Sequence, residues 1–256
     1  MIIACIQSKG GNGKTTSAVN LSHALADQKK KVLLIDLDSQ GSASLSLGIQ
    51  RKDIRPSIAD VLIDDCQIEK TIRPTSVKGL YLISGSMELA NFDVTLANKE
   101  RRAEKLKDVI KSVAPKFDTI IFDCPPTMSL LPVNALVACD HYLVPVQPHY
   151  LALEGLVNLL EAIDRVKTGI GSKASLLGIL LTMVDQRAKA TKEVMDIIRG
   201  QFKGDVFKTE IKTNIKLAEA PSFGKTIFQH DWSCAGAEAY RALAKEVTQR
   251  TKKGKI

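Results

Sequence analysis

The fold is decided by residues 8–16, which read Ser8-Lys9-Gly10-Gly11-Asn12-Gly13-Lys14-Thr15-Thr16. This stretch follows a short apolar run over residues 2–7 and opens a segment with helical spacing over residues 15–28. Its glycines let backbone N–H groups converge on an anion where a Cβ would clash. The helix that begins near Lys14 directs the positive end of its dipole to the same point. The stretch therefore predicts a phosphate-binding loop between a strand and a helix.

Two lysines of this loop have different expected partners. Lys14 is placed to reach the β- and γ-phosphates of a nucleotide, and the Thr15 hydroxyl is placed to bind Mg²⁺. Lys9 points away from its own phosphates in a simple loop of this kind, so it serves either solvent or a partner's nucleotide. The usual pattern has glycine where this chain has Ser8, so the match is imperfect.

The remaining chain alternates buried strand-like runs with helical periods. We predict strands over residues 2–7, 32–38, 80–84, 119–123, 142–146 and 176–184, and helices over residues 15–28, 57–63, 100–113, 151–167, 191–202 and 235–251. Runs rich in Ile, Val and Leu without alternation are typical of strands buried on both faces. We therefore predict an α/β fold, a mostly parallel twisted sheet with helices on both faces, in a single domain over residues 1–256.

Three acids end two of the predicted strands. Asp36 and Asp38 close the run at residues 32–38, and Asp123 closes the run at 119–123. Ligands of open parallel sheets bind beyond the carboxyl ends of the strands, so these side chains are expected near the phosphate loop. Asp123 suits the role of holding Mg²⁺, and Asp38 could orient the attacking water.

Composition excludes several classes of protein. Hydrophobic residues make up 45% of the 256 residues and charged residues 25%, which excludes a disordered or collagen-like chain. Five cysteines without CxxC spacing argue against a disulfide framework or a zinc site. No run is long enough for a transmembrane helix, and no signal peptide is expected. Residues 252–256 are expected to be a disordered tail.

The net charge of +8 is concentrated near the end of the chain. Residues 186–256 hold 15 basic and 8 acidic side chains. Such asymmetry indicates a polyanionic partner, nucleic acid or an anionic membrane, although a solubilising surface would give the same composition.

The motifs together resemble one known family. KGGNGKTT resembles the deviant Walker A motif of the ParA/MinD class, whose common form is KGGVGKTT; DLDSQG resembles its Walker A′ segment and TIIFDCPP its Walker B. The blocks LAEAPSFGKTI and GAEAYRALAKEV are similar to those of ParA/Soj partition ATPases in particular. The resemblance extends through NALVACDHYLVPVQPHYLALEGL and so covers nearly the whole chain.

The resemblance implies a P-loop NTPase with ATP and Mg²⁺ as cofactors and a role for each matching residue. Lys9 would cross an ATP-sandwich homodimer to the partner's phosphates, Lys14 and Asp38 would act in hydrolysis, and Thr15, Asp38 and Asp123 would serve the metal. The nucleotide would be bound by Lys9, Gly10, Gly11, Asn12, Gly13, Lys14, Thr15, Thr16, Met183 and Pro221. The chain departs from the family at Asn12 (commonly Val), Ser39 (commonly Pro) and Lys212 (often Pro).

The resemblance and the charge together predict the partners. ATP-bound dimers would bind double-stranded DNA without sequence specificity, through Arg187, Lys189, Lys192, Lys212 and Lys216. Basal ATP hydrolysis would be weak and stimulated by a ParB-like protein or a cargo adaptor. We expect a cytoplasmic, nucleoid-associated protein of the short Soj-like form, because Met1 directly precedes the first strand and leaves no helix-turn-helix extension.

Three alternatives stay open at this point. The same ATPase could position a protein cargo on the nucleoid instead of partitioning chromosome or plasmid DNA. A MinD-like membrane ATPase would need a terminal amphipathic helix, but residues 248–256 hold one apolar side chain, so no membrane partner is expected. An electron donor of the nitrogenase-reductase kind would need a cluster-binding cysteine pair, and neither Cys124 nor Cys139 has that context.

Overall fold

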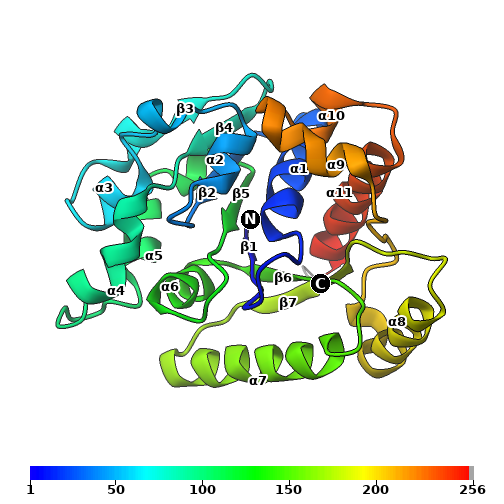
Figure 1. Ribbon diagram of the computed structural model, residues 1–256. Helices are drawn as coiled ribbons and strands as arrows, with labels where there is room; N and C mark the ends of the chain where they lie inside the picture. Colours follow the sequence, from blue (N-terminus) through cyan, green and yellow to red (C-terminus); the bar gives the residue numbers. More distant parts are fainter. Residues whose placement is uncertain (254–256) are drawn as a thin grey trace.

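The structure, a computed structural model, describes residues 1–253 and is built on one seven-stranded sheet (Figure 1). The strand order is β3-β4-β2-β5-β1-β6-β7, and all neighbours are parallel except β3 and β4. The strands are β1 (Ile2–Cys5), β2 (Val32–Asp36), β3 (Arg73–Pro74), β4 (Leu80–Ile83), β5 (Thr119–Asp123), β6 (His141–Val146) and β7 (Ser175–Leu181). The prediction of a mostly parallel α/β sheet is confirmed.

Helices cover both faces of this sheet. They are α1 (Lys14–Asp27), α2 (Ser42–Ser46), α3 (Ile58–Leu62), α4 (Phe92–Thr95), α5 (Lys105–Ile110), α6 (Leu130–Ala138), α7 (Ala152–Ile170), α8 (Lys189–Phe202), α9 (Ile215–Glu219), α10 (Ile227–His230) and α11 (Ala235–Lys253). In Figure 1, α7 and α6 lie on one side of the strands, whereas α1 and α11 lie on the other.

The two faces of the sheet form two separate hydrophobic cores. Successive strand residues point to opposite faces, so Ile3 and Leu34 pack in the core with α1 and α11. Ala4 and Ile35 pack in the other core, with α3 and α5 to α8. Every residue of β2 and β5 is buried, which explains why these runs are apolar without alternation.

The local structure departs from the prediction in several places. The helix predicted over residues 100–113 is only the six residues of α5, because the preceding turns include Arg101 with φ of 53°, a left-handed conformation that cannot continue a helix. Helices α2, α4, α6, α9 and α10 and strand β3 were not predicted. Residues 252 and 253 of the predicted disordered tail are the last residues of α11, and residues 254–256 lie outside the described residues.

The sheet brings distant parts of the chain to one edge. Asp36 at the end of β2 is the register partner of Asp123 at the end of β5, and Asp123 also pairs with Cys5 at the end of β1. The carboxyl ends of these three strands thus lie side by side, where the first loop enters α1. Over the described residues, the helices are too short or too polar to span a bilayer.

Candidate nucleotide and metal site

The phosphate loop joins β1 to α1 and has the backbone its glycines allow. Gly11 and Gly13 have φ of 79° and 76°, a left-handed conformation that residues with a side chain rarely adopt. Gly13 is the N-cap of α1 and makes no side-chain capping bond, so the first N–H groups of the helix stay available to an anion. Lys14 is the first residue of α1 and is 7% exposed. This geometry is that of an anion-binding helix terminus.

Two buried amide side chains hold the loop against the end of β6. The Gln7 amide donates to the Pro145 carbonyl at 2.9 Å and accepts from the Lys9 N–H at 3.4 Å. The Asn12 amide donates to the Lys9 carbonyl at 3.3 Å and accepts from the Gln147 N–H at 3.3 Å. Each of the two side chains is 5% exposed. The backbone of Lys9 is therefore fixed on both sides.

The two lysines of the loop lie in different surroundings. The buried Lys14 side chain lies close enough to Asp123 to counter the rise of that carboxyl's pKa. Lys9 is exposed, and its Nζ lies 3.2 Å from His149 Nε2. Burial and the positive charge of Lys9 lower the pKa of His149. A neutral His149 accepts the hydrogen bond of the ammonium, so the side chain of Lys9 contacts the chain beyond β6.

Asp36 and Asp123 form a buried acidic pair beside the loop. Asp36 accepts from the N–H and the hydroxyl of Ser44 at 2.9 and 2.8 Å, and burial raises its pKa to about 6. Asp123 is fully buried, and neither of its oxygens has a hydrogen-bond partner of good geometry among the described residues. Burial and the neighbouring charge of Asp36 raise the pKa of Asp123, which the nearby Thr15 hydroxyl and Lys14 counter.

A buried carboxylate without a partner is costly unless a cation or donor satisfies it. Asp123, with the Thr15 hydroxyl near it, therefore fits a Mg²⁺ site at the end of β5. The described residues contain no cluster of three or more His, Cys, Asp or Glu side chains that would bind a metal alone. Mg²⁺ commonly keeps waters and binds one or two protein groups together with nucleotide phosphates, so this donor set suits it.

Asp38 lies just past β2, at the mouth of the site. Its side chain is partly exposed and accepts from the Gln40 N–H at 2.9 Å, and its backbone N–H donates to Asp36 at 3.2 Å. The second residue after β4 must be glycine here: a Cβ on Gly85 would lie 2.5 Å from the Asp38 carbonyl oxygen. The backbone of Asp38 is thus closely packed against that of Gly85, while the residue as a whole is partly exposed.

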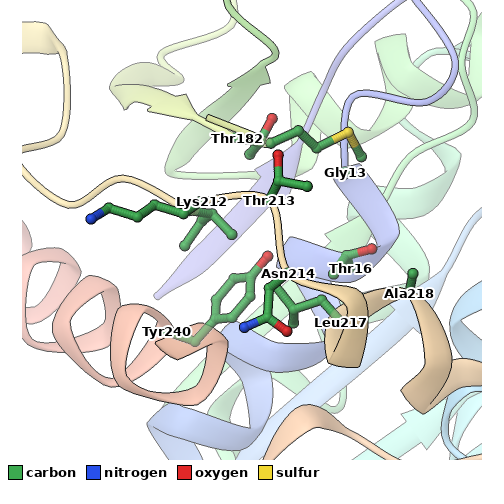
Figure 2. A pocket seen from close by; sticks show the side chains of 11 residues that line it. Gly13, Thr16, Thr182, Lys212, Thr213, Asn214, Leu217, Ala218 and Tyr240 are labelled. Carbon is green, nitrogen blue, oxygen red and sulfur yellow. The ribbon is translucent and has the colours of Figure 1, made fainter. Parts of the chain in front are cut away.

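A cavity of about 200 Å³ opens beside the loop on the α1 side (Figure 2). Its lining comes from the loop and α1, from the end of β7, from the segment before α9, from α9 itself and from α11: Gly13, Thr16, Thr182, Met183, Ile211, Lys212, Thr213, Asn214, Leu217, Ala218 and Tyr240. The Lys212 ammonium points away from the other lining side chains (Figure 2). A mostly apolar slot next to a phosphate loop suits a flat heterocyclic base.

The cavity agrees with some sequence-predicted residues and not with others. Met183 and Thr16 line it, whereas Pro221 is exposed and does not; of the segment 218–221, only Ala218 is part of the lining. Asn214 and Tyr240 were not predicted. Tyr240 is 1% exposed, with its hydroxyl 3.2 Å from Ser17 Oγ, and a lone aromatic in a helical period carries no sequence signal for this contact.

The predicted DNA-binding residues fall into two groups. Arg187, Lys189 and Lys216 each pair with a carboxylate, of Asp185, Glu193 and Glu219 respectively. Lys192 and Lys212 are exposed and have no ion pair within the described part of the chain.

The segment before α9 runs alongside the end of β7. Val184 pairs with Lys212, so this basic position lies near the loop of Arg187. Figure 1 places α8 and α9 apart, joined by the segment that carries Lys212. The five residues therefore lie along an extended surface and do not form one compact cluster.

Comparison with known proteins extends these findings. The family model described as an AAA domain matches residues 1–176. The chain is 41% identical to the chromosome partitioning protein ParA of Myxococcus xanthus over 97% of this chain and 88% of that one. It is 42% identical to the sporulation initiation inhibitor protein Soj of Bacillus subtilis, over 96% of this chain and 97% of that one.

A solved structure is similar over the same length. Cobyrinic acid a,c-diamide synthase from Mycobacterium smegmatis, with bound ADP and magnesium, superposes with a TM-score of 0.86 at 29% identity, covering 99% of this chain and 96% of that one. The name of that protein denotes another reaction, and its sequence identity is lower than that of the two relatives above.

Proposed function

Because the chain belongs to the ParA/Soj family of P-loop partitioning ATPases, we propose that it binds Mg²⁺–ATP, pairs with a second copy and then binds double-stranded DNA to partition chromosome or plasmid DNA. The observation that carries this proposal is the pair of lysines in one phosphate loop. Lys14 is buried at the start of α1, whereas Lys9 is exposed and lies 3.2 Å from His149. A lysine held outside its own phosphate site is available to the nucleotide of a partner.

The nucleotide would lie across the loop with its base in the adjacent cavity. Its phosphates would accept from the N–H groups at residues 10–16 and from the Lys14 ammonium. Thr16 and Met183 line the cavity that would receive the base. Asn12 would act through the loop backbone, since its side chain is committed to Lys9 and Gln147.

Hydrolysis would use the acids at the ends of β2 and β5. Mg²⁺, when bound, neutralises charge on the phosphates; Thr15 and Asp123 would hold it, with Asp38 close by. Asp38 would orient the attacking water, since it is partly exposed just past β2 and next to Asp36. Lys14, and Lys9 from the partner, would stabilise charge that develops on the transferred group.

DNA binding would depend on the dimer because three of the five predicted DNA-binding residues are already paired with a carboxylate. Lys192 and Lys212 are the predicted DNA-binding residues without an ion pair in the described part of the chain, and pairing two chains doubles the phosphate contacts. This surface supports a nucleoid-associated location and an ATPase stimulated by DNA with a ParB-like protein or a cargo adaptor. A protein cargo moved on the nucleoid would use the same surface.

Light scattering with ATP, ADP or no nucleotide tests the dimer. Wild-type protein should double in mass only with ATP and Mg²⁺. The variant Asp38→Ala should retain the ATP dimer while hydrolysis falls at least about 100-fold, because the water is no longer oriented. Lys9→Ala should bind ATP and stay monomeric; an ATP dimer of Lys9→Ala that matches wild type would overturn the role of Lys9.

A further inference from the structure

Lys9, the exposed lysine of the phosphate loop, has a backbone that is fixed by hydrogen bonds to buried side chains. Both peptide groups of Lys9 are bonded to buried amides, its N–H to Gln7 and its carbonyl to Asn12. The Asn12 carbonyl also accepts from the Thr182 hydroxyl at 3.0 Å, so Asn12 ties the loop to β7 as well as to the end of β6. A valine at this position, the residue common in the family, could form neither bond of the Asn12 side chain.

The ammonium group of the same lysine contacts a residue from a distant part of the chain. His149 lies between β6 and α7, and its Nε2 is 3.2 Å from Lys9 Nζ. An ammonium can only donate, so this contact is attractive when the ring nitrogen is unprotonated. Protonation of the ring would replace the hydrogen bond with repulsion between two cations.

We propose that Asn12 and His149 are positioning residues that hold Lys9 against its own chain, Asn12 through the backbone and His149 through the ammonium. This hold must be released before Lys9 can reach the phosphates bound to a second copy. The destination of Lys9 rests on the proposed function, whereas the hold itself concerns the single chain without nucleotide.

The surroundings of His149 leave Lys9 as its main charged neighbour. The residues that line the small cavity between the loop and α7 with His149 are uncharged apart from Lys9. They come from the segment after β1, the loop, the end of β6 and the start of α7: Gln7, Ser8, Asn12, Val146, Leu151, Ala152, Gly155 and Leu156. Glu154, the acid in the first turn of α7, lines the neighbouring groove with Tyr150 and Ile197. Protonation of His149 therefore acts chiefly on Lys9.

The direction of the effect follows from the charges. Neutral His149 stabilises the held lysine and so opposes dimerisation, while protonated His149 releases it. Since the pKa of His149 is lowered, release takes place below the ordinary histidine range. Exposed charged contacts change equilibria by only about two- to fivefold, so the hold adjusts the ATP requirement and does not block dimerisation.

The hold can be tested on the protein without nucleotide by following the four histidines in an NMR pH titration. In Lys9→Met the proton affinity of His149 should rise about two- to fivefold, because a positive neighbour and a hydrogen-bond donor are removed. Asn12→Val should also raise the proton affinity of His149, but by a smaller factor. His23, His141 and His230 serve as internal references; a His149 titration that is the same in wild type and Lys9→Met would overturn the hold.

Its consequence can be tested by the ATP concentration that gives half-maximal dimer at pH 7.5 and 5.5. Relative to wild type, His149→Gln, which keeps an uncharged acceptor, should lose the pH response that comes from the ring. Asn12→Val should need about threefold less ATP at pH 7.5. The matched control His141→Gln, at the opposite end of β6, should keep the wild-type pH response. The protonation of ATP itself affects all variants equally and cancels in the comparison.

The two proposals fail in different ways. If no variant dimerises with ATP but Lys9→Met raises the proton affinity of His149, the hold on Lys9 stands and the proposed function is wrong. If the protein dimerises with ATP and His149→Gln responds to pH as wild type does, the proposed function stands and the regulatory role of His149 is wrong.

Discussion

At the scale of single residues, the site buries two acidic side chains next to each other. Asp36 and Asp123 are paired in register at the ends of β2 and β5, both are fully buried, and Asp123 has no hydrogen-bond partner of good geometry among the described residues. Asp36 is compensated by Ser44 at the start of α2. The carboxylate of Asp123 lacks such compensation, so a bound cation would contribute to stability as well as to chemistry.

This pair predicts a pH-dependent stability without metal. Both acids have raised pKa values in the folded chain, about 6 for Asp36, so folding favours their protonated forms. Their stabilisation is complete below the ordinary aspartate pKa; that of Asp36 is lost as pH rises from about 4 through 6, and that of Asp123 is also lost as pH rises above the ordinary aspartate pKa. In EDTA, the unfolding temperature Tm of wild type should therefore fall by several degrees as pH rises across this range. The Tm of Asp123→Asn should fall less.

The control for this prediction is Asp196→Asn, an exposed acid on α8. It should follow wild type at every pH. ATP with Mg²⁺ should raise the Tm of wild type above that with ATP and EDTA, and this metal increment should be lost in Asp123→Asn. Equal pH slopes for wild type and Asp123→Asn would show that Asp123 carries no such cost.

The thiols near this site take no part in its chemistry. Burial raises the pKa of Cys5 and Cys124 well above the ordinary range, so neither is ionised at neutral pH. All five cysteines are free. Cys5 and Cys124 pack in opposite cores as small apolar side chains, as their positions in apolar runs indicated.

At the scale of elements, the strands were predictable and several helices were not. Runs such as residues 32–36 are buried on both faces, so composition alone identifies them. Helix α6 is apolar nearly all round, and its sequence LLPVNALVA therefore lacks the polar face that marks a helix. The two-residue strand β3 pairs antiparallel with β4 at the edge of the sheet and has no sequence pattern of its own.

The site was predictable where its residues are neighbours in sequence. Glycines, Lys14 and Thr15 form one continuous motif, and strand ends bring Asp36 and Asp123 beside it. The contacts of Asn12 with Gln147 and of Ser17 with Tyr240 join residues 135 and 223 positions apart. No local pattern encodes such contacts, which is why the hold on Lys9 and the place of Tyr240 emerge only from the structure.

At the same scale, the segments after β7 predict which cations bind DNA. Lys192 on α8 has no ion pair in the described part of the chain, whereas Lys189 lies 3.6 Å from Glu193. Lys192→Glu should lower the magnitude of the log–log salt slope of DNA binding by about one or more per chain, and addition of Lys212→Glu should lower it further. The ATP dimer of Lys192→Glu should form as in wild type.

The matched control is Lys173→Glu, just before β7, at the amino ends of the parallel strands. Since this residue is far from the ends of the strands where Lys212 lies, the change should leave the salt slope as it is. If Lys173→Glu and Lys192→Glu weaken DNA binding equally, the cations act through overall charge and the proposed surface is wrong.

At the scale of the whole molecule, the charge and the nucleotide site share one part of the chain. Residues 186–256 hold 15 basic and 8 acidic side chains, and the same region supplies the segment before α9 and the helix α11 that line the cavity beside the phosphate loop. Lys212 lines that cavity and directs its ammonium outward (Figure 2). The cavity proposed to receive the base and the proposed DNA-binding surface are thus connected through one segment, which would give ATP a physical route to control DNA binding.

The central claim is that ATP converts this chain into a dimer that binds DNA through phosphate contacts. The most direct test is fluorescence polarisation of a random-sequence duplex with ATP, ADP or no nucleotide across a salt series, with Lys9→Ala as the matched variant. We predict tight binding only for wild type with ATP, falling steeply with salt. Equal binding in all three nucleotide states, or full binding by Lys9→Ala, would contradict the account.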